Sequence, residues 1–325
     1  MMTPPARSTP ETGAPDDIVP DSEARGIVGW LPRAMRPFVL LARLDRPIGA
    51  WLLFWPGAWA VALAGGARDR PWLFAWLALG SVAMRGAGCV YNDIVDRDLD
   101  ARVARTAARP LASGAVSLKA AWAWLAVLAL VGLIVLLNLG DGIAMAIAVA
   151  SLALVAAYPF MKRVTWWPQA WLGLVFSWGA LVGWAAARHA AFTARPFAEV
   201  MAPSLWLYAG SVFWVIGYDT IYAVQDIEDD ALAGVKSSAR ALGRGLRGGV
   251  ALCYAFAVAL WGVALWQVRP QPLVLAALAP VALHMARQVA LLRRDDGARA
   301  LALFRSNRGA GLLMLLACLI VGITA

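Results

Sequence analysis

Stretches of about 20 mostly apolar residues recur along almost the whole chain, and each is long enough to cross about 30 Å of hydrocarbon. Hydrophobic residues make up 61% of the 325 residues and charged residues only 15%, whereas a soluble domain is about half apolar and about a quarter charged. These values exclude an ordinary soluble protein and predict an all-α, polytopic membrane protein. The net charge of +9 is explained by Lys and Arg in cytoplasmic loops, so we expect no nucleic acid partner.

Hydropathy predicts nine spans in one bundle, and the last of them is short. The spans are placed at residues 48–65, 71–91, 118–138, 142–159, 167–187, 200–225, 247–267, 272–292 and 309–325. Lys and Arg concentrate in the N-terminal stretch and after the even-numbered spans, with about 21 on that side against about 5 on the other. This asymmetry predicts a cytoplasmic N-terminus and a C-terminus on the opposite side.

The chain divides into three parts by composition. Residues 1–26 contain five acids and almost no bulky apolar side chains, which is typical of a disordered polar tail. Residues 27–46 mix basic and bulky apolar side chains and are expected to lie on the membrane surface as an amphipathic segment. Residues 47–325 form the transmembrane domain. The three cysteines lie in separate apolar segments without metal-ligand spacing, so we interpret them as core residues.

Carboxylates are concentrated in two short windows, YNDIVDRDLD at 91–100 and YDTIYAVQDIEDD at 218–230. The two windows hold nine of the fifteen acids that lie outside the polar tail. The first window ends the second span and the second window ends the sixth span, so both are expected on the cytoplasmic side. A separation of four helices is the arrangement of a parallel repeat.

Helical geometry selects particular residues from each window, because residues three or four apart share a helix face. Four acids of the windows lie outside the shared faces, and we expect them to be solvated or to support the residues on the faces. They are Asp93, Asp98, Glu228 and Asp229. Neutralisation of the adjacent basic loops would not explain the same face-selective spacing in both windows. The residues on the two faces are Asn92, Asp96 and Asp100 in the first window, and Asp219, Tyr222, Asp226 and Asp230 in the second.

Two facing acidic faces require a cation, because two unit charges 4 Å apart repel by roughly 4 kcal/mol at an effective dielectric constant of 20. Carboxylate and amide oxygens without His or Cys nearby favour a hard ion. Mg²⁺ in particular is commonly bound by one or two carboxylates together with substrate phosphates. The windows therefore predict Mg²⁺ and a phosphorylated substrate.

Basic residues near the predicted cytoplasmic ends of several spans are candidates for the same site. A diphosphate that is partly neutralised by metal needs further donors of this kind, although each could instead determine topology. Arg85 lies inside the second span, about two turns before Asn92, and is expected to face the bundle interior and to pair with an acid of either window. The other basic candidates are Arg43 and Arg46 before the first span, Arg102, Arg105 and Arg109 after the second, and Lys162 and Arg163 after the fourth.

The two windows resemble the signatures of the UbiA-type intramembrane aromatic prenyltransferases, NDxxDxxxD and DxxYAxxDxxxD. The segment RTAARPLASG follows the first signature, and the resemblance extends over about residues 43–325 through RLDRPIGAWLLFWP, YPFMKRVTWWPQAWLG and GVKSSARALG. The combination of YDTIYAVQDIEDD with YPFMKR is most similar to the 4-hydroxybenzoate polyprenyltransferases of ubiquinone biosynthesis.

The resemblance implies a nine-helix bundle with a lateral opening to lipid and a central cavity capped on the cytoplasmic side. It implies Mg²⁺-dependent transfer of a polyprenyl group from polyprenyl diphosphate to the ring carbon ortho to the hydroxyl of 4-hydroxybenzoate. Lys162 and Arg163 would bind either the diphosphate or the benzoate carboxylate, and Asp219 or the released diphosphate would accept the ring proton.

The family roles fall on the following residues of this sequence. The implied catalytic residues are Asp96, Asp100, Asp219, Asp226 and Asp230. The implied metal ligands are Asn92, Asp96 and Asp100 in one cluster, and Asp226 and Asp230 in the other. The implied substrate-binding residues are Arg46, Arg105, Tyr158, Lys162, Arg163 and Tyr222.

Two alternatives to this function are a prenyltransferase that acts on another aromatic acceptor and a cation-coupled transporter. The acids argue against a transporter, because they lie at helix ends on one side of the membrane and none is near the midplane. An Ala- and Arg-rich chain with an acidic tail is typical of a bacterial inner membrane protein, and the mitochondrial inner membrane is the alternative location.

Overall fold

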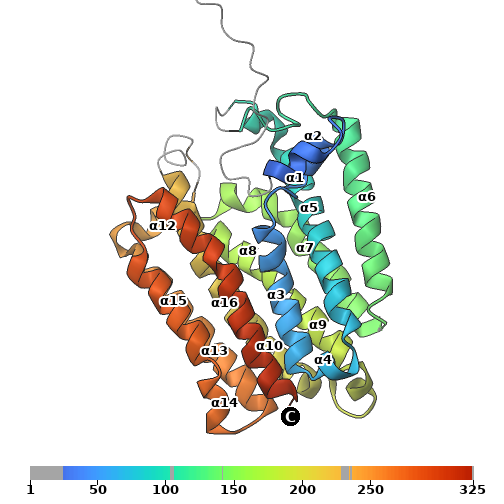
Figure 1. Cartoon of the computed structure of the whole chain (residues 1–325), viewed down its shortest axis with the longest axis vertical. Coiled ribbons are helices and arrows are strands. Elements are labelled where there is room, and N and C mark those ends of the chain that lie inside the picture. The colour runs from blue at the N-terminus through green and yellow to red at the C-terminus, as the bar shows by residue number, and fades with distance from the viewer. Residues whose placement is uncertain (1–24, 103–105, 141, 228–233, 235, 324–325) are drawn as a thin grey trace, which may run out of the picture.

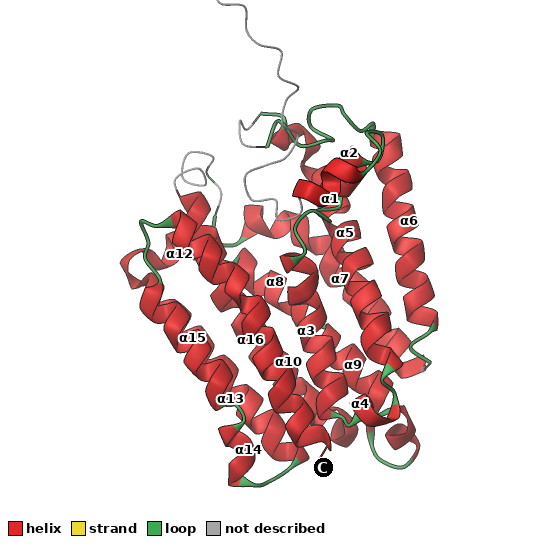
Figure 2. Ribbon diagram, viewed as in Figure 1, coloured by secondary structure: helices red, strands yellow, loops and turns green. Residues whose placement is uncertain are grey.

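The structure, a computed structural model, describes residues 25–102, 106–140, 142–227, 234 and 236–323, and this part of the chain is helical without strands (Figure 2). Eight apolar helical segments have the length and composition to cross a membrane, and a ninth, α3 (Ile48–Leu63), has 16 residues. These nine segments correspond to the predicted spans and confirm the polytopic bundle. The other eight are α5 (Trp72–Asp100), α6 (Leu118–Leu137), α7 (Gly142–Val164), α8 (Pro168–Ser177) followed by α9 (Gly179–Ala187), α10 (Phe197–Tyr222), α13 (Leu246–Val268), α14 (Pro272–Ala276) followed by α15 (Ala279–Leu291), and α16 (Gly297–Ile323).

The ninth span is longer than the sequence predicts. α16 has 27 residues and begins at Gly297, whereas the prediction begins at residue 309. Hydropathy falls at Arg299, Arg305 and Arg308, but arginine is a good helix former, so the helix continues through them. The shortest apolar segment is instead α3.

The two ends of the bundle carry different short elements (Figure 1). Helices α1 (Arg25–Trp30), α2 (Arg36–Leu41) and α12 (Ser238–Leu242) lie at one end, whereas α4 (Gly66–Asp69), α14 and the C-terminal end of α16 lie at the other. The chain thus enters α3 and leaves α16 at opposite ends of the bundle, as an odd number of spans requires. The predicted polar tail, residues 1–26, lies outside the described residues except for its last two positions.

Three buried tryptophans join the helices at the centre of the bundle. The ring of Trp59 on α3 lies 4.9 Å from that of Trp214 on α10 and 5.2 Å from that of Trp261 on α13, measured between ring centroids. The indole N–H of Trp59 donates to the backbone carbonyl of Gly311 (2.8 Å), and that of Trp214 donates to Asn307 Oδ1 (2.9 Å). Because the buried indole N–H groups of Trp59 and Trp214 have acceptors on α16, and that of Trp261 donates to Ser211 on α10, these contacts hold four helices in one packed block.

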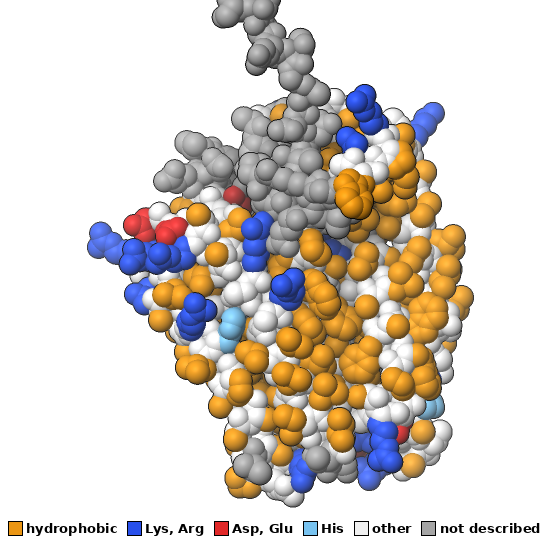
Figure 3. Space-filling view, viewed as in Figure 1, with side chains coloured by type: hydrophobic (Ala, Val, Ile, Leu, Met, Phe, Trp, Pro, Cys, Tyr) orange, Lys and Arg blue, Asp and Glu red, His pale blue; other side chains and the backbone are white. Residues whose placement is uncertain are grey.

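The outer surface is apolar over most of its height. Figure 3 shows hydrophobic side chains across the middle of the visible face, with Lys and Arg mainly toward its two ends. Helix α6 is an example: Leu130 is 56% exposed and Leu137 is 63% exposed. Exposed apolar surface of this extent is expected for helices that face lipid.

Candidate active site

A cavity of about 660 Å³ lies between α3, α5, α6, α7 and α8, with further lining from α9, α10 and α16, and is within the size range of small-molecule binding sites. Most of the lining consists of apolar side chains, and charged and polar side chains line one end. The cavity agrees with the predicted architecture, and its two-part lining suits a substrate with a charged head and an apolar tail. The polar end is lined by Arg43, Arg46, Asn92, Asp93 and Arg109.

The first acidic window forms the last turns of α5, which ends at Asp100. Asn92, Asp96 and Asp100 therefore share one helix face, as their spacing predicts. Asn92 borders the cavity, whereas Asp96 is 0% exposed and Asp100 is 6% exposed. The following loop folds back over the helix end, and the hydroxyl of Thr106 donates to the backbone carbonyl of Asp100 (2.8 Å).

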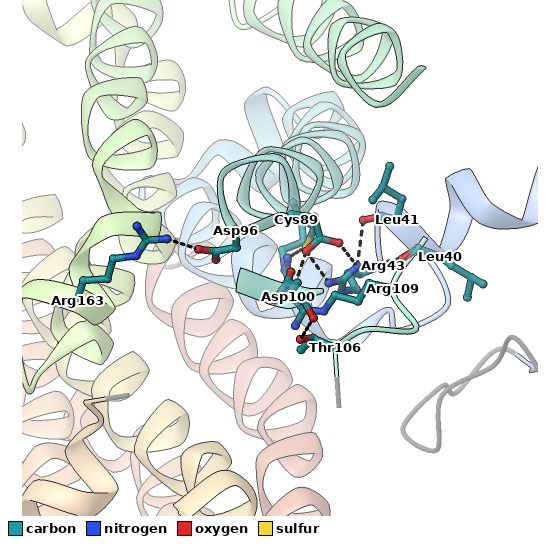
Figure 4. A network of polar contacts seen from close by, with 11 residues as sticks. Leu40, Leu41, Arg43, Cys89, Asp96, Asp100, Thr106, Arg109 and Arg163 are labelled. Atoms are coloured by element: carbon teal, nitrogen blue, oxygen red, sulfur yellow. Dashed lines mark hydrogen bonds and ion pairs between the residues drawn. The ribbon is translucent and has the colours of Figure 1, made fainter. Parts of the chain in front are cut away.

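Arginines from separate elements neutralise these two buried carboxylates (Figure 4). Arg163 at the end of α7 donates from Nη2 to Asp96 Oδ1 (2.9 Å), and Arg109 donates from Nη1 to Asp100 Oδ2 (2.7 Å). The side chain of Arg163 is 50% exposed, so part of its guanidinium is accessible to an incoming anion. The fold thus brings one predicted substrate-binding residue against one predicted metal ligand.

Asp93 is a site residue that helical spacing alone assigns to the wrong face. It is 1% exposed and lines the cavity, so the solvated alternative is wrong for this residue. Arg43 donates to both carboxylate oxygens of Asp93 (2.9 and 3.0 Å), and Arg109 donates to Oδ1 (3.3 Å). The loops that carry these arginines cover a second face of α5, which spacing within the helix cannot indicate. Asp98, by contrast, has a 90% exposed side chain, so it is solvated.

Replacing Asp93 with Ala is expected to destabilise the protein by about 2 kcal/mol. The substitution leaves two arginines without their shared carboxylate, and the loss is smaller than the 3–5 kcal/mol of a fully buried pair because the side chain of Arg109 is 30% exposed. Thermal unfolding of the detergent-solubilised protein measures the effect, with Asp98→Ala on the same helix as control. Equal melting temperatures for the two variants would show that the Asp93 network does not stabilise the fold.

The second window does not continue as one α-helix. α10 ends at Tyr222 and is followed by a 3₁₀ helix, η2 (Ala223–Asp226). Because a 3₁₀ helix has about three residues per turn, Asp226 is rotated from its position in a continuous α-helix, although its carboxylate still interacts electrostatically with that of Asp219. Asp219 and Tyr222 both line the cavity. Asp230, Glu228 and Asp229 lie outside the described residues.

The predicted substrate-binding residues divide between the cavity and its polar end. Tyr158 lines the cavity. Arg46 also lines it, and its Nε donates to Asp45 Oδ2 (3.2 Å), which holds the guanidinium at the polar end. Arg105 lies outside the described residues, and so does the side chain of Lys162.

Arg85 faces the interior, as predicted, but its contacts differ from the prediction. Its guanidinium contacts Cys89 Sγ and lies over the ring of Phe176, 5.9 Å from the centroid. It forms no ion pair with a described residue, and its buried Nε has no hydrogen-bond partner. Asp219 lines the same cavity and interacts with Arg85 electrostatically, without direct contact. Arg85 therefore offers a positive charge and free donor capacity to the cavity, which suits an anionic ligand group.

The acids on α5 fit a hard divalent cation by their chemistry. Asn92, Asp96 and Asp100 offer only amide and carboxylate oxygens, which Mg²⁺ prefers over thiol or imidazole ligands. Among the residues that the structure describes, no three His, Cys, Asp or Glu side chains converge on one point. One or two carboxylates are sufficient where substrate phosphates complete the coordination of Mg²⁺, so the donor set is compatible with a metal that binds together with its substrate.

A helical membrane bundle with a cavity that is charged at one end and apolar along the rest defines a protein that acts on amphipathic molecules. Residues 53–319 match the model of the UbiA prenyltransferase family. The chain belongs to this family and is a membrane-embedded prenyltransferase.

Curated relatives match most of the chain. The chain is 39% identical to "4-hydroxybenzoate polyprenyltransferase, mitochondrial" of Rattus norvegicus, over 96% of this chain and 84% of the rat protein. It is 38% identical to the protein of the same name from Caenorhabditis elegans, over 93% of this chain and 83% of the relative. The mitochondrial names of these relatives differ from the bacterial inner membrane expected from composition, whereas a multi-pass membrane location is common to both.

Solved structures share the fold. A UbiA homolog from Aeropyrum pernix K1 superposes with a TM-score of 0.68 at 28% identity, covering 83% of this chain and 97% of the homolog. A UbiA homolog from Archaeoglobus fulgidus bound to GPP and Mg²⁺ superposes with a TM-score of 0.60 at 16% identity, covering 89% of this chain and 100% of the homolog. At this low identity the second similarity concerns the fold alone.

Proposed function

We propose that the protein transfers a polyprenyl group from polyprenyl diphosphate to the ring carbon ortho to the hydroxyl of 4-hydroxybenzoate and releases diphosphate. The observation that carries this proposal is the placement of Arg85. Arg85 lines the cavity and forms no ion pair with a described residue, and there it would hold the benzoate carboxylate. The names of the rat and nematode relatives support the same acceptor.

The diphosphate of the donor would lie at the charged end of the cavity. We assign one metal site to Asn92, Asp96 and Asp100, and a second to Asp226 and Asp230. Mg²⁺, when bound there, would offset the charge that develops on the leaving diphosphate. Basic residues would bind the remaining diphosphate oxygens, and the best placed of them are Arg43, Arg46, Arg109 and Arg163.

The reaction is an electrophilic aromatic substitution. The allylic C–O bond breaks and its electron pair leaves with the diphosphate, while the ortho carbon of the ring forms the new C–C bond. The ring then loses its proton and becomes aromatic again. Asp219 lines the same cavity as Arg85, which supports its carboxylate as the acceptor of this proton; the released diphosphate is the alternative acceptor.

The apolar part of the cavity would protect the allylic cation from water. Leu52, Leu77, Met84 and Leu152 line this part, and none of them can bind a water molecule through its side chain. Exclusion of water is required because water would compete with the aromatic ring for the cation. The active-site end would face the cytoplasm in a bacterial inner membrane and the matrix in a mitochondrial inner membrane.

A comparison of acceptors tests the proposal. Isolated membranes that contain the protein are incubated with a labelled polyprenyl diphosphate and with 4-hydroxybenzoate, phenol, benzoate or 1,4-dihydroxy-2-naphthoate. We expect prenylated product only from 4-hydroxybenzoate, because phenol lacks the carboxylate for Arg85 and benzoate lacks the activating hydroxyl. Product from the naphthoate and none from 4-hydroxybenzoate would assign the protein to another acceptor.

A further inference from the structure

The hydroxyl of Tyr218 on α10 is a buried donor that no described residue satisfies. Tyr218 is 1% exposed, and its Oη has no hydrogen-bond partner among the residues that the structure describes. A buried polar group without a partner destabilises the folded state, and such groups are rare in folded proteins. Tyr218 also lines the cavity, which makes a ligand group that accepts this hydrogen bond the simplest explanation.

Aromatic neighbours hold the ring of Tyr218 in place. Its centroid lies 4.9 Å from that of Trp214 and 5.8 Å from that of Phe304, both in edge-to-face arrangements. Tyr222, one helical turn further along α10, shares the face of Tyr218 and packs against the same ring of Phe304 (4.6 Å between centroids). The ring of Tyr218 is therefore fixed before a ligand binds, which lowers the entropic cost of a hydrogen bond from its hydroxyl.

Arg85 presents a second unsatisfied donor to the same cavity. Its buried Nε has no partner among the described residues, and its guanidinium interacts electrostatically with Tyr218. Both side chains line the cavity. A carboxylate has two oxygens and accepts several hydrogen bonds, so one carboxylate can accept from both donors. A neutral ligand group would leave the charge of Arg85 uncompensated.

We propose that Tyr218 binds the aromatic acceptor and that its hydroxyl donates a hydrogen bond to the carboxylate held by Arg85. The inference rests on the proposed function, which places the carboxylate of 4-hydroxybenzoate at Arg85. Tyr218 then selects acceptors that carry a carboxylate, because a ring without this group would leave the hydroxyl buried and unsatisfied. Arg85 supplies the charge, and Tyr218 fixes the orientation of the carboxylate.

The test measures ligand binding by Tyr218→Phe, which removes only the hydroxyl. Labelled 4-hydroxybenzoate is bound at equilibrium to the detergent-solubilised protein and is displaced by benzoate or by phenol. We expect Tyr218→Phe to weaken the binding of 4-hydroxybenzoate and of benzoate roughly tenfold each, the size of effect of one hydrogen bond to a charged group, and to leave the binding of phenol unchanged. Weaker binding of phenol alone, or of all three ligands equally, would overturn the inference.

Tyr208→Phe is the matched control on the same helix. The hydroxyl of Tyr208 donates to the backbone carbonyl of Leu174 (3.2 Å), and Tyr208 is not part of the cavity lining. This variant should keep the wild-type affinities and have a slightly lower melting temperature, because it loses a hydrogen bond. Tyr218→Phe should show the opposite pattern, with a melting temperature equal to or above that of the wild type, since no bond to a described residue is lost. A lower melting temperature of Tyr218→Phe with unchanged affinities would show that the hydroxyl stabilises the fold instead.

A double variant tests whether Tyr218 and Arg85 act on the same ligand group. Because both residues would donate to one carboxylate, the loss of benzoate affinity in the variant that combines Arg85→Met with Tyr218→Phe should be smaller than the product of the two single losses. A loss equal to that product would assign the two residues to different parts of the ligand and overturn the shared contact.

The inference and the proposed function fail separately, because binding is measured without turnover. Absence of prenyl transfer by a wild-type protein that still binds benzoate through Tyr218 would contradict the proposed function alone. Normal prenyl transfer together with equal benzoate affinities in the wild type and Tyr218→Phe would overturn the inference alone.

Discussion

Replacing Asp96 with Asn is expected to lower kcat/KM for prenyl transfer roughly 10³-fold, comparable with the loss of one preorganised hydrogen-bond donor in other active sites. The substitution removes one negative charge from the acidic face of α5 but nearly preserves the shape of the side chain. Asp96 is 0% exposed and accepts a hydrogen bond from Arg163 (2.9 Å). Initial rates in detergent or in isolated membranes at saturating Mg²⁺ measure the effect.

Asp98→Asn is the matched control for Asp96→Asn. Asp98 lies two residues further along α5, and its side chain is 90% exposed, so we expect activity close to that of the wild-type protein. Near-normal activity of Asp96→Asn at saturating Mg²⁺ would remove Asp96 from the metal site. Comparable melting temperatures of the two variants would exclude misfolding as the reason for a loss.

Replacing Arg85 with Met is expected to raise the KM for 4-hydroxybenzoate roughly 10- to 100-fold and to change the KM for the donor much less. A hydrogen bond to a charged group contributes about 1.5–3 kcal/mol, and the buried Nε of Arg85 has no partner among the described residues. Methionine preserves much of the apolar stem and removes the charge. Steady-state kinetics with each substrate varied in turn separates the two effects.

Two further variants are measured in the same way: Arg85→Lys, which keeps the charge, and Arg97→Gln, which is the matched control. Lysine retains the charge without the planar donor pair of arginine. The KM of Arg85→Lys for 4-hydroxybenzoate should therefore lie between those of the wild type and Arg85→Met. Arg97 is on the same helix, has a 48% exposed side chain and does not line the cavity, so its variant should keep the wild-type KM. An unchanged KM for 4-hydroxybenzoate in Arg85→Met would place the carboxylate elsewhere.

The sequence predicts the membrane spans well, because every span must carry enough consecutive apolar residues to cross the hydrocarbon layer. It fails at the start of α16, where a hydropathy average drops at Arg299 and Arg305 although the backbone hydrogen bonds of the helix continue. The face shared by Asn92, Asp96 and Asp100 was predictable for a related reason, since α5 is a regular helix through this window.

The parts of the site that were not predictable depend on contacts between distant segments. Asp93 is buried because Arg43 and Arg109 reach it from two loops, and the sequence spacing within α5 carries no signal for either contact. The tightening of the chain into η2 before Asp226 was also not predictable from the spacing of the acids. The surroundings of Arg85 depend on Phe176, which lies far along the chain.

The most direct test of the central claim is Mg²⁺-dependent prenylation by the wild-type protein. Isolated membranes are incubated with labelled 4-hydroxybenzoate and a long-chain polyprenyl diphosphate, with Mg²⁺, with EDTA, and with EDTA followed by excess Mg²⁺. We predict a lipid-soluble labelled product that is lost with EDTA and restored by Mg²⁺, because the acids at the ends of α5 and η2 bind the diphosphate through a divalent cation. Product formation that EDTA leaves undiminished would contradict this role of the acids.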